Sequence, residues 1–181
     1  MGSSYNNYLF VFTFLSLAYI SSADLVSDVC SKTKDPAYCV KFVKPLYKLG
    51  TTTPIDFTNA TLEASKNVLY LVYLDIIGRE TKASKSNNPV LSGQYRECKP
   101  HYEYAVSALR QSQAISDLPN HYKRMARLAG HALTEIQYCD SNFTPIRSMP
   151  ADFKALHQNS LNVCDICKVL TTHLAVRTGA I

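Results

Sequence analysis

A stripe of apolar and small residues between Tyr95 and Ser116 places the strongest constraint on how this chain folds. Its members recur at alternating spacings of three and four, which is the period of one face of an α-helix. Val106 and Ile115 widen the stripe enough for two neighbouring helices, and a disulfide from Cys98 would point into the core. We therefore predict a central helix over 95–116 around which the other helices pack. The stripe consists of Tyr95, Cys98, Tyr102, Ala105, Leu109, Ser112 and Ser116.

Three further stretches, 56–82, 120–139 and 153–174, carry the same helical spacing. Segments rich in Pro, Asn, Ser and Asp separate them and end the helices. No alternating run is long enough for a sheet. We predict an all-α bundle of four long helices. The supporting rows are Leu62, Leu69, Val72 and Ile76; Met125, Leu128, Ala129, Ala132, Leu133 and Ile136; and Phe153, Leu156, Ser160, Val163, Cys167, Leu170 and Leu174.

Pro100 lies inside the predicted central helix, where proline removes a backbone hydrogen bond and clashes with the preceding turn. We expect a kink there, held by a disulfide from the neighbouring Cys98. The alternative is that the regular part of the helix starts nearer Lys99.

Residues 1–23 have the character of a secretory signal peptide. Residues 8–20 form a short apolar run, and Ser21, Ser22 and Ala23 are the small residues that a signal peptidase prefers. A membrane anchor is the alternative, but a spanning helix needs about 20 apolar residues. We expect cleavage after Ala23, a mature domain over 24–181 that leaves no membrane segment, and an extracellular location.

Six cysteines in a secreted chain predict disulfides, with 15 possible pairings that the sequence alone cannot separate. Cys30 and Cys39 flank the turn signal Lys34-Asp35-Pro36, so a helical hairpin closed by a short bridge is natural. Cys98 and Cys139 each lie on the core stripe of a different predicted helix.

The net charge of +5 indicates attraction to acidic polymers or acidic partners. Lys and Arg are scattered, without an arginine-rich arm or zinc finger, which argues against nucleic acid. Lys123, Arg124 and Arg127, with His121 and His131, form either a basic binding patch or an ordinary solvated face. His101, His121 and His131 are pH sensors or simple surface residues, since unperturbed histidine titrates near pH 6.5.

The segment 29–39, VCSKTKDPAYC, resembles the opening signature of the plant invertase and pectin methylesterase inhibitors. So do Tyr95-Arg96-Glu97-Cys98 with Tyr102 and Ala105-Val106, Ala132-Leu133-Thr134 leading to Cys139-Asp140, and the segment 162–166, NVCDI. The resemblance implies a cell-wall (apoplastic) protein with an antiparallel four-helix bundle preceded by a helical hairpin. It also implies the disulfides Cys30–Cys39 and Cys98–Cys139.

Two features favour the pectin methylesterase branch of the family. Cys164 resembles the free cysteine in the last helix of the esterase inhibitors, and the Pro-Lys-Phe motif of the invertase branch is missing around 120–124. The resemblance then implies a one-to-one complex that covers the pectin cleft of the esterase. Inhibition of a cell-wall or vacuolar invertase is the alternative.

The chain departs from the esterase inhibitors at Pro100 and Tyr104, where acidic residues are usual, and at Tyr138, where a small residue is usual. Several of these positions face the enzyme in the family. Tyr102 is the candidate contact that matches the family well. The basic residues would meet acidic enzyme loops or de-esterified pectin. The expected partner contacts are Tyr102, Tyr104, Lys123, Arg124 and Arg127.

Cys164 and Cys167 have the spacing of a redox or metal dithiol, for which His157 or His173 would be the nearby partners in sequence. They fall mid-helix, without the helix N-terminus that activates a thiol, so we expect structural free thiols, with covalent dimerisation as the next option.

Asn59 and Asn142 begin glycosylation sequons, of which Asn59 is the better acceptor because Pro145 follows the other. No catalytic motif, cofactor site or metal site is expected; a redox or ligand-binding bundle is the remaining alternative.

Overall fold

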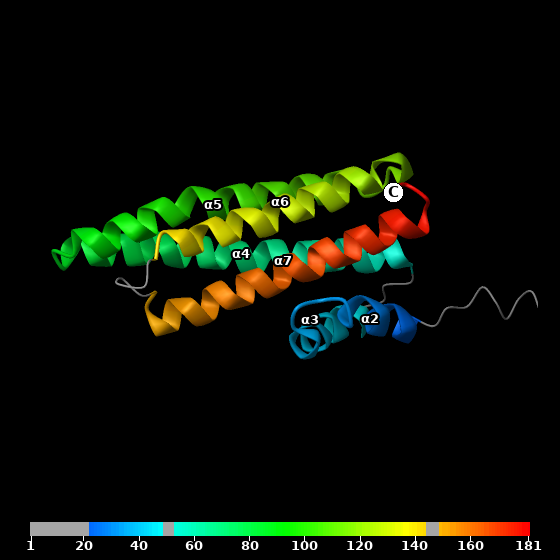
Figure 1. Ribbon diagram of the computed structural model, residues 1–181, viewed down its shortest axis with the longest axis horizontal. Coiled ribbons are helices and arrows are strands. Elements are labelled where there is room, and N and C mark those ends of the chain that lie inside the picture. The colour runs from blue at the N-terminus through cyan, green and yellow to red at the C-terminus, as the bar shows by residue number, and fades with distance from the viewer. Residues whose placement is uncertain (1–21, 49–52, 144–148) are drawn as a thin grey trace, which may run out of the picture.

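The computed structural model describes residues 22–48, 53–143 and 149–181, which are helical apart from short connections (Figure 1). The predicted signal peptide falls almost wholly outside these ranges. None of the described helices is long and apolar enough to span a bilayer. The elements are α2 (Ser22–Cys30), α3 (Pro36–Lys48), α4 (Pro54–Lys85), α5 (Pro89–Ala114), the 3-10 turn η1 (Pro119–His121), α6 (Tyr122–Ser141) and α7 (Ala151–Arg177).

Helices α4 to α7 form an antiparallel four-helix bundle, as the sequence predicts (Figure 1). Helix α5 packs between α4 and α6, and α7 closes the bundle against α6 and α4. The expected central position of α5 is therefore wrong. In cross-section the four helices form a square, in which α5 occupies one corner and its neighbours α4 and α6 occupy two corners that are diagonal to each other. A corner helix packs against two neighbours, so it needs an apolar stripe as wide as that of α5.

Helices α4 and α5 begin where side chains satisfy their free N–H groups. Thr53 and Asp56 form a reciprocal capping box at the start of α4. The side chain of Asn88 accepts a hydrogen bond from the Leu91 amide (3.1 Å) at the start of α5, with Pro89 as the first helical residue. Helix α5 thus starts well before the expected 95 and runs on through Pro100. A start near Lys99 is wrong; the kink stays a prediction.

The hairpin of α2 and α3 packs on α7 and α4 through a small apolar core of its own. The Cys30–Cys39 disulfide closes it, as predicted. At its turn, the backbone N–H of Lys34 donates to Oδ2 of the buried Asp165 on α7 (2.7 Å). His173 Nδ1 also lies 3.1 Å from the Asp28 carboxylate. These two polar contacts hold the hairpin to the bundle.

Candidate partner-binding surface

The neighbouring helices α5 and α6 present four of the five predicted contact residues on one outer surface. The Cys98–Cys139 disulfide joins the two helices as predicted, and Ser112 Oγ donates to the Met125 carbonyl (3.3 Å) further along. These two links set the antiparallel register. Because of it, Tyr104 lies level with the middle of α6.

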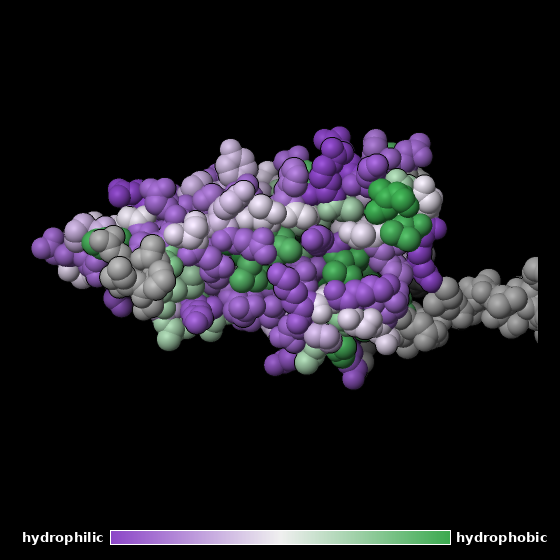
Figure 2. All heavy atoms as spheres, in the orientation of Figure 1, coloured by the Kyte–Doolittle hydropathy of each residue, from purple (hydrophilic) through white to green (hydrophobic). Residues whose placement is uncertain are grey.

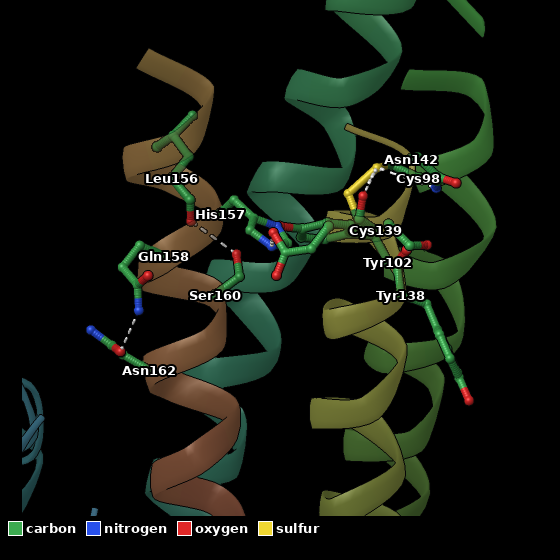
Figure 3. Close-up of polar contacts among 12 residues, drawn as sticks. Cys98, Tyr102, Tyr138, Cys139, Asn142, Leu156, His157, Gln158, Ser160 and Asn162 are labelled. Carbon is green, nitrogen blue, oxygen red and sulfur yellow. Dashed lines mark hydrogen bonds and ion pairs between the residues drawn. A yellow bond between two sulfur atoms is a disulfide. The ribbon is translucent and has the colours of Figure 1, made fainter. Parts of the chain in front are cut away.

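Two tyrosines are the large aromatic side chains that this surface exposes. Tyr104 is 67% exposed and Tyr138 is 52% exposed. The Tyr138 ring lies 5.6 Å from the ring of His101, whose Nδ1 is 2.8 Å from the Glu135 carboxylate. Figure 3 shows Tyr138 pointing away from the bundle interior. Exposed tyrosines suit protein recognition because they offer large contact area at low entropic cost, and Tyr138 is also held against a neighbouring ring.

The basic residues of α6 continue this surface. Lys123, Arg124 and Arg127 are all exposed, and across the described ranges none of them forms an ion pair. Residues 123, 127, 131, 134 and 138 follow one another at spacings of three and four, so they share one side of α6. We call this surface the α5–α6 face; it comprises His101, Tyr104, Lys123, Arg124, Arg127, His131 and Tyr138.

Tyr102, the fifth predicted contact residue, does not lie on this face. It is fully buried, and its hydroxyl is 2.9 Å from Nδ1 of His157 on α7. Burial raises the pKa of the Tyr102 phenol well above its usual value. The expected contact with a partner is therefore replaced by a role in the core.

His157 connects Tyr102 to the end of α6. Its Nε2 lies 2.9 Å from the Asp140 carboxylate, a charge contact without hydrogen-bond geometry. Burial lowers the pKa of His157, and the nearby Asp140 opposes that shift. This network is not predicted from the sequence, although His157 is four residues from Phe153 on the core row of α7 and Asp140 directly follows Cys139. It joins α7 to the disulfide-linked pair (Figure 3).

Cys164 and Cys167 are free and completely enclosed in α7, as expected for structural thiols. Burial raises the pKa of Cys164 well above its usual value and that of Cys167 to about 12. Both thiols therefore stay protonated, whereas redox exchange needs an accessible thiolate. Within the described residues, no group of His, Cys, Asp and Glu side chains could hold a metal ion.

The two sequons lie in different settings. Asn59 is half-buried in the second turn of α4, and its Oδ1 is enclosed without a hydrogen-bond partner in the part of the chain described. Asn142 caps the C-terminus of α6, and its carbonyl accepts from the Gln94 side chain (3.0 Å). Thr144 of the second sequon lies outside the described residues. Glycosylation at both positions stays a prediction.

A disulfide-stapled helical bundle with an exposed tyrosine and basic face has the features of a protein-binding module. The side of the molecule in Figure 2 is mainly hydrophilic, with small, separate hydrophobic patches. Comparison with known families then identifies the chain: it matches over residues 24–168 and belongs to the plant invertase/pectin methylesterase inhibitor family.

Two solved structures share the fold. A mutant form of a pectin methylesterase inhibitor from Arabidopsis has a TM-score of 0.68 and 20% identity, over 81% of this chain and 95% of that one. A pectin methylesterase inhibitor from Arabidopsis thaliana has a TM-score of 0.60 and 19% identity, over 85% and 98%. A comparison with curated proteins gave no match.

Proposed function

We propose that this protein is a secreted inhibitor of pectin methylesterase that binds the enzyme one-to-one and covers its pectin cleft. The observation that carries the proposal is the family membership over residues 24–168, combined with the α5–α6 face. Within the family, Cys164 and the absence of a Pro-Lys-Phe motif before α6 favour the esterase over invertase. The protein is expected to act by binding alone, without a cofactor and without chemistry of its own.

The α5–α6 face offers both parts that a protein interface needs. Tyr104 and Tyr138 supply aromatic anchors, and Lys123, Arg124 and Arg127 supply positive charge around them. An esterase surface with acidic loops, or one carrying bound de-esterified pectin, would be attracted electrostatically. The disulfide Cys98–Cys139 and the Tyr102–His157 contact hold the helices beneath the face, so little ordering is needed on binding.

An extracellular location in the plant cell wall fits the same evidence. The two disulfides favour an oxidising compartment, where such bonds form and persist. The family match begins at residue 24, directly after the expected cleavage site. We therefore assign 24–181 as the mature inhibitor domain, without a nucleic-acid or membrane partner.

The function is tested by titrating the purified protein against a plant pectin methylesterase and, in parallel, a cell-wall invertase at about pH 5 to 6, where a wall protein operates. We expect stoichiometric loss of the esterase activity alone. Loss of invertase activity alone would assign the chain to the other branch of the family. If neither activity falls, the inhibitor proposal is rejected. Tyr104 and Tyr138, which depart from the residues usual in the esterase inhibitors, would then have removed the complementarity to the enzyme.

A further inference from the structure

Helix α4 exposes an apolar strip on the side away from the bundle core. Leu71 is 66% exposed, Tyr70 48%, Leu74 44% and Ile77 36%. At 100° per residue, these side chains lie within about 60° on either side of Leu74. Polar residues extend the strip at both ends. We call it the α4 stripe: Glu63, Asn67, Tyr70, Leu71, Leu74, Ile77, Gly78, Thr81 and Lys85.

No side chain or backbone of the described residues crowds Gly78, which lies in this stripe. It lies inside a regular helix, where glycine costs roughly 0.5–1 kcal/mol relative to alanine. A Cβ atom added at this position would meet nothing within 4 Å. The glycine therefore leaves open space within an apolar surface, where a side chain from another molecule has room.

We propose that the α4 stripe binds a second copy of this chain, with the two α4 helices antiparallel. The stripe is symmetric about Leu74: Glu63 lies 11 residues before it and Lys85 11 residues after it. A two-fold axis at Leu74 brings Glu63 of one copy opposite Lys85 of the partner subunit, at both ends. Antiparallel helix dipoles also attract one another.

The same axis matches the side chains in the middle of the stripe. Tyr70 lies over Gly78 of the partner subunit, where the missing Cβ leaves room for its ring. Leu71 packs beside Ile77 of the partner subunit, and the two copies of Leu74 meet on the axis. The result is an apolar centre with polar and charged ends, which is the usual anatomy of an isologous interface.

The position of α4 leaves this interface independent of the proposed inhibition. Helices α4 and α6 lie at diagonal corners of the bundle and do not pack on each other. A dimer through α4 would therefore leave the α5–α6 face of each copy open to a target enzyme.

Sedimentation velocity over a concentration series tests the proposal on the purified protein with both disulfides formed. We expect a monomer–dimer equilibrium for the wild type. Leu74→Glu or Leu71→Glu should weaken dimerisation by at least about 30-fold, the loss expected for a central anchor. The matched control is Val90→Glu, which places the same charge at an exposed apolar position of α5 (41% exposed) and should leave the dimer unchanged. Circular dichroism checks that each variant is folded.

Two further experiments test the geometry of the interface. Leu74→Cys should cross-link to its copy under mild oxidation with diamide, while Val90→Cys should not. Glu63→Lys should weaken the dimer, and adding Lys85→Glu in the same chain should restore it, since the charge pair is then reversed. A wild-type chain that stays monomeric up to its solubility limit would overturn the proposal. A dimer that survives Leu74→Glu would also overturn it. So would variants of the α4 stripe that still dimerise but no longer bind the esterase. The first two results would leave the proposed inhibition standing, because inhibition by the wild type is measured separately.

Discussion

The outer sides of α4 and α6 carry opposite chemistry on the same scaffold. Both helices bury a continuous apolar row in one core. The solvent-exposed side of α4 carries leucine, isoleucine and a glycine that nothing crowds, whereas that of α6 carries basic residues and a tyrosine. Core rows alone therefore explain the bundle, and the outer sides decide what it binds. In our proposals the α4 stripe is complementary to itself, while the α5–α6 face, which carries excess positive charge, binds a different and acidic partner.

The largest effect should come from removing the bridge beneath the α5–α6 face. Replacing both Cys98 and Cys139 by serine opens a loop of sequence separation 41. The chain-entropy relation gives a loss of about 4 kcal/mol in the free energy of unfolding, against about 3 for the Cys30–Cys39 pair as control. Urea unfolding measures both, and inhibition should also fall. A loss below about 1 kcal/mol would show that the bridge does not support this face.

Loss of the exposed tyrosines should separate the two faces in function. Tyr138→Ala and Tyr104→Ala should each weaken esterase inhibition roughly 10- to 30-fold, the effect of removing an aromatic anchor. Tyr70→Ala is the matched control, because Tyr70 is similarly exposed but lies on α4. Inhibition constants measured for the three variants decide the matter. If Tyr70→Ala is the harmful change, the assignment of the faces is reversed.

Acid should loosen the support of the α5–α6 face. The pKa of His157 is lower in the folded protein than in the unfolded chain, where it lies near 6.5. The unfolded chain then binds more protons, so stability is full above about pH 6.5 and falls as the pH drops towards the folded pKa.

Urea midpoints at about pH 7.5 and about pH 5 should show this loss, and His157→Gln should reduce it. His173 shifts in the same direction through burial, so the dependence should not vanish. His131→Gln, on the exposed side of α6, is the control. An unchanged slope in His157→Gln would rule out the titration of this buried histidine.

The smallest effect should come from the exposed charges. Lys123→Glu, Arg124→Glu or Arg127→Glu should slow association with the esterase a few-fold, and added salt should reduce the difference. Lys154→Glu on α7 makes the same charge change away from the face. Stopped-flow inhibition kinetics compare them. Equal slowing by Lys154→Glu would mean that net charge matters and the location of the basic residues does not.

Much of this architecture could be predicted from the sequence because helical spacing is a local property. The apolar rows gave the four long helices, and the resemblance gave the disulfide pairing. The predicted central position of α5 is wrong because an apolar stripe shows how much of a helix is buried and does not show on which sides the neighbouring helices pack. The early start of α5 at Pro89 was missed because the cap from Asn88 is a polar signal outside the apolar row.

Site residues were harder to predict because they depend on contacts between distant segments. Tyr102 fitted both a core row and a list of contact positions, and only its burial distinguishes the two. Its link to His157 spans 55 residues of chain. The α4 stripe escaped notice because its apolar residues alternate with the core row of the same helix.

Tyrosine footprinting tests the division between the two faces most directly. The protein is labelled by hydroxyl radicals with and without a saturating pectin methylesterase, and modification of each tyrosine is measured by mass spectrometry. We predict that Tyr104 and Tyr138 become protected when the esterase is added, while the reactivity of Tyr70 does not change. Protection of Tyr70 on adding the esterase, with Tyr104 and Tyr138 still reactive, would contradict the account.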